Sequence, residues 1–271
     1  MAESNNYCRI CGPTSFDLFL IKNNHHLNQC RECGLIQVTD DLTNLNLKGI
    51  YGQEFFEKTY DWLEKDFKGE KKEYKKFQYR MQEIETLYPP KGNILDIGCS
   101  YGYFLDVARS RGWAPMGIEI GEYAAKFAQT RLALKVYNSD FMLSEIPFDY
   151  FDVVTLWNVL EHLDDPIAVF RKINMSLKRR GLVVFTTGDT GSYIRKLQGT
   201  RWRAFIPPIH LANYNVKSIR RLLEKTGFSL MVRSVALPYE FILKKLRMIN
   251  ILKKINFSDK MMIFALKEKS L

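Results

Sequence analysis

The sequence predicts an α/β protein built on a doubly wound sheet of seven strands. Short apolar runs with the length of buried strands alternate with segments of helical periodicity from about residue 90 onward. A glycine turn joins the first of these runs to the first helix, and two consecutive strands close the chain. Alternation followed by a terminal strand pair is the pattern of a doubly wound sheet.

The glycine turn lies within residues 93–105, between an apolar strand and an apolar-periodic helix. A strand, a turn and a helix start bring backbone N–H groups and a positive dipole end together, which favours an anionic or polar cofactor group. Gly98 would let the chain pass close to a ligand, and Gly102 would let the helix pack closely. The dinucleotide fingerprint is absent, because Ser100 and Tyr103 stand at two of its glycine positions.

Two more predicted strands end near acidic residues. Glu119 ends the strand at 116–118, about twenty residues after Gly98, where such folds place a ribose-binding carboxylate. Asp140 follows a segment at 134–137. The remaining predicted elements are a helix at 124–132, a strand at 151–156, a helix from Asp165-Pro166 to Gly181, a strand at 182–186, a helix at 216–226 after Asn215, and strands at 228–235 and 261–266.

The sequence divides into three predicted segments. Residues 1–45 are a cysteine-bearing module, 46–90 are a charged, aromatic-rich helical segment, and 91–271 are the α/β domain with a basic amphipathic insertion at 239–257. We expect the helical segment to pack on the core, with a lid over the cofactor as the alternative. We expect the insertion to be a packed helix, with peripheral contact to an anionic membrane as the alternative.

Two cysteine pairs with a two-residue spacing stand near the start of the chain: Cys8, Cys11, Cys30 and Cys33. Gly12 and Gly34 follow the pairs and allow the tight turn that a metal-binding knuckle needs. Four thiolates in this spacing predict a structural tetrahedral zinc site. We expect His25 and His26 to be loop residues, because the cysteines already fill the coordination shell. The fifth cysteine, Cys99, is expected to be a small packing residue rather than a nucleophile.

Residues 90–235 resemble the class I S-adenosylmethionine-dependent methyltransferases, through the ordered motifs Asp96-x-Gly98-x-Ser100-x-Gly102, Glu119 and Asp140. The resemblance implies a Rossmann-like, mostly parallel sheet with one antiparallel strand near the edge. Together with the cysteine pairs it indicates a methyltransferase with a small N-terminal zinc ribbon and a helical segment. The cofactor implied is S-adenosylmethionine.

The resemblance also implies which residues bind the cofactor. Glu119 would accept hydrogen bonds from the ribose hydroxyls. Ile120 and Phe141 would sandwich the adenine, and Asp140 would accept from its amine, with a helix-capping role for Asp140 as the alternative. The full set of predicted cofactor residues is Asp96, Gly98, Cys99, Ser100, Gly102, Tyr103, Phe104, Glu119, Ile120, Asp140, Phe141, Trp157 and Asn158.

The predicted acceptor site uses two histidine-bearing segments. In residues 156–163, His162 is the best candidate for a general base, since imidazole titrates near neutrality, and Glu161 would orient it. Residues 207–214 resemble a segment of zinc-ribbon methyltransferases, so His210 and Tyr214 are candidates to face the acceptor. The alternatives are that His162 braces its turn and that the second segment only packs.

Charge is unevenly distributed. Residues 171–271 hold 22 Lys/Arg and 5 Asp/Glu, a balance of +17, whereas residues 1–170 hold 18 and 25, a balance of −7. A solvated basic face explains this as well as an anionic partner does. No apolar run approaches the ~18 residues of a membrane span, and the start lacks a signal-peptide pattern, so we expect a cytoplasmic protein.

Three functions therefore remain open. The favoured one is methyl transfer to an anionic small-molecule acceptor, including a nucleotide-linked or lipid-linked sugar, because the resemblance implies acceptors of this kind. The second is an RNA methyltransferase that uses the zinc module and the basic C-terminal third. The third is a non-catalytic zinc-bearing interaction protein that keeps the fold. The sequence does not indicate an oligomeric state.

Overall fold

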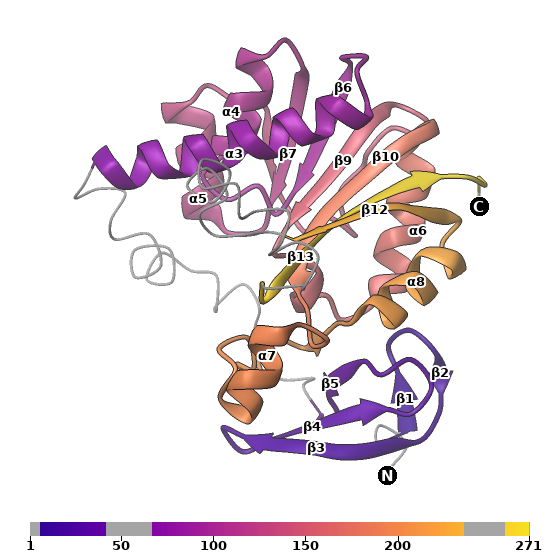
Figure 1. Ribbon diagram of the computed structural model, residues 1–271. Coiled ribbons are helices and arrows are strands. Elements are labelled where there is room, and N and C mark those ends of the chain that lie inside the picture. Colours follow the sequence, from indigo (N-terminus) through magenta and orange to yellow (C-terminus); the bar gives the residue numbers. More distant parts are fainter. Residues whose placement is uncertain (1–5, 42–66, 236–257, 271) are drawn as a thin grey trace. The chain divides into compact units, whose positions relative to one another are not determined.

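The computed structural model describes residues 6–41, 67–235 and 258–270 (Figure 1). The chain forms two compact units. The glycine-loop unit comprises Leu45–Trp157 and Met175–Val184. The ribbon unit comprises Met1–Asn44, Asn158–Asn174 and Phe185–Leu271. The three predicted segments stay a prediction.

One seven-stranded sheet confirms the predicted fold class. Its strand order is β12-β13-β10-β9-β6-β7-β8. The pairs β6–β9, β6–β7 and β7–β8 are parallel, and β12–β13 is antiparallel. The strands are β6 (Asn93–Ile97), β7 (Ala114–Glu119), β8 (Val136–Asn138), β9 (Phe151–Trp157), β10 (Leu177–Gly188), β12 (Phe228–Val235) and β13 (Lys260–Lys267).

One predicted helix boundary is wrong. The helix that starts at Pro166, α6 (Pro166–Ser176), ends five residues before Gly181, which lies inside β10. The carbonyl oxygens of Met175 and Ser176 accept hydrogen bonds from the backbone of Asp149 and Tyr150. These carbonyls at the end of the helix are satisfied by a neighbouring segment, so the helix needs no further turn to cover them.

Among the described residues of the glycine-loop unit there are three helices: α3 (Phe67–Leu87), α4 (Tyr103–Ser110) and α5 (Glu122–Arg131). Helix α3 packs on α4, as Figure 1 shows. Tyr74 of α3 donates a hydrogen bond to Asp106 of α4 over 2.7 Å, and Phe77 lies edge-on to Phe104. Part of the predicted helical segment therefore packs on the core, and residues 46–66 lie outside the described residues.

The ribbon unit contains a four-stranded antiparallel sheet in the order β11-β5-β4-β3. Its strands are β3 (Phe16–Lys22), β4 (His25–Cys30), β5 (Ile36–Val38) and β11 (Ala212–Asn213), and a separate ladder joins β1 (Tyr7–Cys8) to β2 (Gly12–Pro13). Besides α6, the described part of this unit contains the helical elements η2 (Leu160–His162), α7 (Tyr193–Gln198), η3 (Gly199–Arg201) and α8 (Val216–Lys225).

The expectation that His25 and His26 are loop residues is wrong, because both lie in β4. Asn23 and Asn24 have φ values of 51° and 60° and form the two-residue turn between β3 and β4. Two positive φ values give the turn type that matches strand twist, so pairing continues up to the turn. The Nδ1 atoms of both histidines lie within hydrogen-bond distance of Asp40.

Among residues 6–41, 67–235 and 258–270, no helix combines the length and apolarity needed to cross a bilayer. The predicted amphipathic insertion at 239–257 lies outside the described residues. Its packing or membrane contact stays a prediction, as does the cytoplasmic location.

Candidate functional site

The glycine loop leaves β6 through three residues with left-handed backbone. Gly98, Ser100 and Gly102 have φ values of 70°, 51° and 81°. At Gly102 an added Cβ would lie 2.7 Å from Leu134 and 3.0 Å from Ala128 of α5. Such contacts are tighter than side chains allow. The prediction that this glycine permits close helix packing is therefore confirmed.

Glu119 ties the glycine loop to the start of α5. Its side chain is 5% exposed, its Oε2 accepts from the Ser100 N–H and its Oε1 accepts from the Gly121 N–H, each over 2.8 Å. Burial raises the pKa of Glu119, and the backbone hydrogen bonds act in the opposite direction. A carboxylate has about four acceptor positions, so Glu119 can still accept from a further donor.

Asp96 and Cys99 are buried beside this carboxylate. The Thr155 hydroxyl donates to Asp96 over 2.6 Å. Burial raises the pKa of Asp96 to about 8, and the nearby charge of Glu119 acts in the same direction. Asp96 is therefore mostly protonated at neutral pH. Burial also raises the pKa of Cys99 well above its usual value, which fits the expected packing role and not that of a nucleophile.

Ser100 Oγ and Trp157 Nε1 are buried polar atoms without a hydrogen-bond partner among the described residues. The Trp157 ring lies 5.0 Å from the ring of Phe104, and the Arg80 guanidinium lies 4.5 Å from its centroid. Buried polar atoms are rarely left unsatisfied in a folded protein. Their presence beside the glycine loop fits a polar ligand that supplies the missing partners.

The candidate adenine residues follow β7 and β8. Phe141 is buried and Ile120 is half-buried. The Met142 N–H donates to Asp140 Oδ1 over 2.7 Å, so this carboxylate caps its own turn, which was the alternative interpretation. Oδ1 of Asp140 is thus already engaged. The role of this residue in cofactor binding stays a prediction.

In the ribbon unit the structure brings His162 and His210 together. Their rings are edge to face with centroids 4.8 Å apart. His162 Nδ1 lies 2.9 Å from the carbonyl oxygen of Ile209, and His210 Nδ1 lies 2.7 Å from that of Ala204. A carbonyl only accepts, so each Nδ1 carries a proton, and in the neutral form of each ring Nε2 is the acceptor nitrogen. Burial lowers the pKa of His210, which keeps this ring neutral at pH 7.

The other two predicted catalytic residues brace this pair. Glu161 is buried and accepts from the Thr187 hydroxyl over 3.0 Å. One carboxylate oxygen of Glu161 and one ring nitrogen of each histidine lie within 4.8 Å of one another. Tyr214 is fully buried and donates to the carbonyl oxygen of Leu160 over 3.3 Å. Backbone carbonyls therefore orient the imidazoles, Glu161 contributes a nearby negative charge, and Tyr214 packs the loop.

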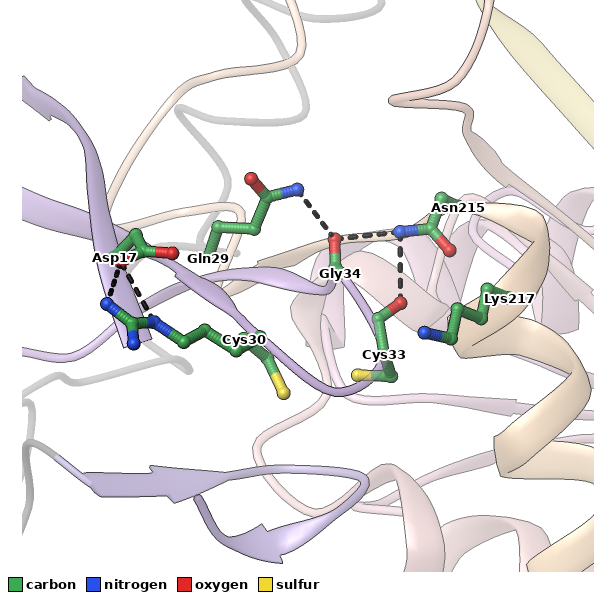
Figure 2. A pocket seen from close by; sticks show the side chains of 8 residues that line it. Asp17, Gln29, Cys30, Cys33, Gly34, Asn215 and Lys217 are labelled. Atoms are coloured by element: carbon green, nitrogen blue, oxygen red, sulfur yellow. Dashed lines mark hydrogen bonds and ion pairs between the residues drawn. The ribbon is translucent and has the colours of Figure 1, made fainter. Parts of the chain in front are cut away.

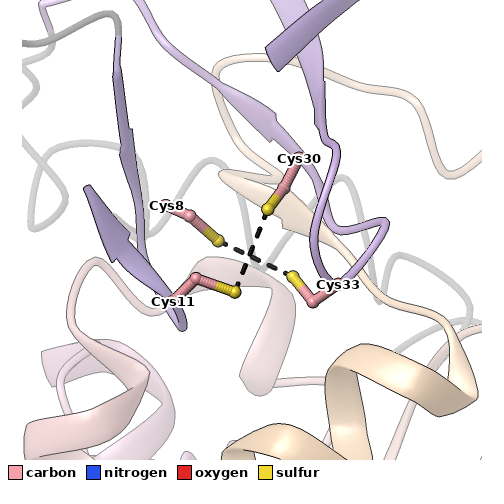
Figure 3. Close-up of side chains that lie close together, drawn as sticks. All are labelled: Cys8, Cys11, Cys30 and Cys33. Carbon is pink, nitrogen blue, oxygen red and sulfur yellow. Dashed lines mark hydrogen bonds between the residues drawn. The ribbon is translucent and has the colours of Figure 1, made fainter. Parts of the chain in front are cut away.

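The four cysteines converge in the ribbon unit, as Figure 3 shows. Cys8 Sγ lies 3.7 Å from Cys33 Sγ, Cys30 Sγ lies 3.9 Å from Cys11 Sγ, and all four sulfurs lie within 4.8 Å of one another. A tetrahedral zinc ion with Zn–S bonds of about 2.3 Å separates its sulfurs by about 3.8 Å. The geometry of the cluster therefore fits a zinc ion at its centre.

Comparison with known proteins identifies the family. A family model described as a methyltransferase domain matches residues 70–232. The chain belongs to this methyltransferase family. This match confirms the resemblance to the class I methyltransferases.

Relatives of the methyltransferase domain cover part of this chain. A protein named ubiquinone biosynthesis O-methyltransferase from Pseudomonas fluorescens (strain SBW25) is 33% identical over 143 residues, 45% of this chain and 61% of that protein. One with the same name from Thiobacillus denitrificans is 30% identical over 172 residues, 55% of this chain and 74% of that protein. The chain thus spans about three fifths of the length of the Pseudomonas relative.

Solved methyltransferase structures share the fold. A SAM-dependent methyltransferase from Archaeoglobus fulgidus matches with a TM-score of 0.54 and 22% identity over 70% of this chain and 92% of that one. Magnesium protoporphyrin IX methyltransferase from Synechocystis PCC 6803, with bound SAH, matches with a TM-score of 0.56 and 15% identity over 80% and 98%.

The sequence did not indicate one lysine of the ribbon unit that contacts a predicted cofactor residue. Lys260, the first residue of β13, donates to Asn158 Oδ1 over 2.8 Å, and Asn158 has a φ of 57°. An ammonium only donates, so this contact fixes which way the Asn158 amide faces. The two residues are 102 positions apart, and no local pattern connects them.

Three arginines in the segment from α7 to His210 have different environments. Arg203 pairs with Asp259 over 2.7 Å. The Arg195 guanidinium lies 4.9 Å from the ring centroid of Phe19. Arg201 is exposed. Of these three, Arg201 is the side chain best placed to meet an anionic solute.

Proposed function

We propose that the protein is an S-adenosylmethionine-dependent methyltransferase that acts on a small-molecule acceptor. The buried Glu119 carboxylate carries this proposal, because it joins the glycine loop after β6 to the start of α5 after β7. Ligands of open α/β sheets bind at the carboxyl ends of the strands, where this carboxylate lies. Membership of the methyltransferase family and the solved relative with bound SAH support the choice of cofactor.

The residues present suit that cofactor. Glu119 would accept from the ribose hydroxyls with its remaining acceptor positions, Ser100 Oγ and Trp157 Nε1 would gain the partners they lack, and Phe141 with Ile120 would cover the adenine. When bound, S-adenosylmethionine supplies an electrophilic methyl group on a positively charged sulfur. The other residues proposed to line the cofactor site are neighbours of these in the sequence: Asp96, Gly98, Cys99, Gly102, Tyr103, Phe104, Asp140 and Asn158.

We further propose that the histidine pair removes the proton of an acceptor hydroxyl. Backbone carbonyls hold both rings so that Nε2 faces away from them, and the lowered pKa of His210 keeps that ring neutral, so that it can accept a hydrogen bond from the acceptor molecule. In this step the proton moves from the hydroxyl oxygen to an imidazole Nε2. His162 is the proposed base and His210 the positioning group. Relatives named O-methyltransferases support an oxygen acceptor.

The acceptor is proposed to be anionic, because exposed Arg201 follows α7 and the last hundred residues are strongly basic. Nucleotide-linked and lipid-linked sugars have this charge. The four cysteines are proposed to hold one structural zinc ion, since their sulfur separations match a tetrahedral site.

Turnover of labelled S-adenosylmethionine tests the function. The panel contains nucleotide sugars, lipid-linked sugars and RNA, and the Glu119→Ala variant serves as the background control. Methylation of one small-molecule class supports the proposal. Methylation of RNA alone would replace it with the nucleic-acid alternative, and absence of SAH binding in calorimetry would favour the non-catalytic alternative.

A further inference from the structure

Helix α8 touches both cysteine knuckles of the ribbon unit, one near each of its ends. At the start, Asn215 Nδ2 donates to the carbonyl oxygens of Cys33 over 3.2 Å and Gly34 over 2.7 Å, as Figure 2 shows. At the last turn, Lys225 Nζ donates to those of Ile10 over 2.7 Å and Cys11 over 3.2 Å. One helix thus holds the backbone of both Cys-x-x-Cys segments.

Asn215 performs two tasks at once. Its Oδ1 accepts from the Ser218 N–H over 2.9 Å, while the Asn215 N–H donates to Ser218 Oγ, which completes a capping box for α8. Capping fixes the amide so that Nδ2 faces the knuckle. Gly34 leaves room for this contact, because a Cβ there would lie 2.8 Å from Asn215 Nδ2. The cap of the helix and the support of the knuckle therefore share one side chain.

The segment just before Asn215 carries His210 and is built into the ribbon. β11 pairs with β5, and the Val38 N–H donates to the Leu211 carbonyl over 2.9 Å. On its other side, the Leu211 N–H donates to the Glu161 carbonyl over 2.8 Å. The backbone of residue 211 thus connects the ribbon strand to the turn that carries His162.

The core under this segment also comes from the ribbon. Trp202 and Phe205 are fully buried against three ribbon side chains: Leu27, Ile36 and Val38. If β4 and β5 were not ordered, these two aromatic side chains would be exposed to solvent, at a cost of about 25 cal/mol for each Å² of apolar surface. The carbonyl that orients His210 belongs to Ala204, which lies between them in sequence.

We propose that Asn215 and Lys225 are positioning residues that couple the cysteine cluster to the His162–His210 pair. In this arrangement metal binding orders the two Cys-x-x-Cys segments, and α8, which is hydrogen-bonded to both, fixes the position of the segment that carries His210 and thereby the orientation of the two imidazoles. The catalytic consequence rests on the proposed function, whereas the coupling itself does not.

The test uses full-length variants that separate the two tasks of Asn215. Asn215→Asp keeps a good N-cap but replaces the donor with a carboxylate that faces two carbonyl oxygens. Ser218→Ala is the matched control, because it weakens the same cap and does not touch the knuckle. Lys225→Met removes the second contact, and Lys225→Arg restores a donor at the same place.

Three measurements follow for each variant: the rate of metal transfer to a chelating dye, the ring resonances of His162 and His210 by NMR, and SAH affinity by calorimetry. Asn215→Asp and Lys225→Met should speed metal transfer by about tenfold or more, as loss of outer-shell support does elsewhere. They should also shift both histidine resonances and leave SAH affinity unchanged. Ser218→Ala and Lys225→Arg should resemble the wild type.

With an identified acceptor, Asn215→Asp should lower kcat more than it raises KM. Unchanged histidine resonances in both Asn215→Asp and Lys225→Met would overturn the coupling, whatever their activity. Equal shifts in Ser218→Ala and Asn215→Asp would overturn it too, since helix capping alone would then explain the effect. A wild type without transferase activity would contradict the proposed function but leave the NMR and metal-transfer tests valid.

Discussion

The two units of the molecule build their candidate sites in opposite ways. In the glycine-loop unit, Glu119 bonds to Ser100 and Gly121, which are 19 and 2 residues away along the chain. In the ribbon unit, Asn215 bonds to Gly34 across 181 residues, and Lys225 bonds to Cys11 across 214. The first site follows from local strand–turn–helix patterns, whereas the second exists only once distant segments have come together.

The two sites also differ in their electrostatics. The glycine-loop unit holds carboxylates whose pKa is raised by burial, at Asp96 and Glu119. The ribbon unit holds a histidine whose pKa is lowered by burial. Burial disfavours the charged form in each case, so it moves acids and bases in opposite directions. We expect substitutions at the histidine pair or the cysteines to leave SAH binding intact, and substitutions at Glu119 to leave metal binding intact. The following experiments test this separation.

The largest expected effect is on turnover, from the histidine pair. His162→Asn should lower kcat by about 10²–10⁴, which is the range for loss of a general base. His210→Asn should have a smaller effect, because it is proposed to position the acceptor. SAH affinity should stay unchanged in both variants. The control is His26→Asn in β4, far from the pair in sequence. If both variants kept wild-type turnover on the true acceptor, transfer by positioning alone would be the better account.

Loss of a metal ligand should affect the ribbon unit and leave cofactor binding in place. Cys30→Ser should lower the metal content and the stability of the ribbon, because binding energy on the order of 10 kcal/mol in such clusters is folding energy. Elemental analysis and thermal unfolding measure both effects. Cys99→Ser, outside the cluster, should keep full metal. A Cys30→Ser protein with wild-type metal content and stability would rule out this ligand set.

Glu119→Ala should weaken SAH binding by about 10- to 100-fold, since the ribose hydroxyls lose a charged acceptor and a hydrogen bond to a charged group is worth about 1.5–3 kcal/mol. Calorimetry measures the affinity. Glu122→Ala is the matched control, because Glu122 is an exposed carboxylate in the first turn of α5. Metal content should be unaffected in both. Equal affinities for Glu119→Ala and wild type would refute the ribose assignment.

The contrast between local and distant contacts explains what the sequence could predict. β12 was predicted with its observed bounds, and Asn215 was predicted as a helix start, because both follow from local pattern. The second hydrogen bond of Asn215, to the knuckle, was not predictable, since nothing near position 215 indicates a partner at 34. Lys260 was missed for the same reason.

The helix end near Gly181 shows the limit of local rules. A glycine after an apolar-periodic segment is a good stop signal. Here the carbonyl oxygens of Met175 and Ser176 are taken by another segment, so the helix ends earlier. The positive φ of Asn23 and Asn24, in contrast, has a local cause, and the Asn-Asn pair was a turn signal that could have placed His25 and His26 in a strand.

A pH-dependent effect is expected from Asp96 in the cofactor-free protein. Its pKa is about 8 in the folded state and about 3.9 in an unfolded chain, so between these values the folded state binds more protons. The contribution of Asp96 to the free energy of unfolding is therefore largest below about pH 4. It falls as the pH rises to about 8, by up to about 1.4 kcal/mol per pH unit.

Asp96→Asn cannot titrate and keeps an acceptor for Thr155, so its melting temperature should change less between pH 5 and pH 8 than that of the wild type. Thermal unfolding at four pH values across this range measures the difference. Asp17→Asn, an exposed carboxylate of the ribbon unit, is the control and should follow the wild-type curve. Parallel curves for Asp96→Asn and wild type would show that Asp96 is ionised in the folded protein.

The smallest expected effect is on acceptor binding, from Arg201. Arg201 is exposed, and an exposed charge contributes on the order of 1 kcal/mol or less to binding an anion, a fewfold change at low salt. Arg201→Ala should therefore raise the KM of an anionic acceptor by about threefold while kcat and SAH affinity stay unchanged. The control, Arg131→Ala, removes an exposed arginine at the end of α5 in the glycine-loop unit. Because salt screens exposed charges, the difference between the two variants should shrink as ionic strength rises. A KM increase of equal size in both variants would mean that the overall positive charge attracts the acceptor and that Arg201 has no specific role.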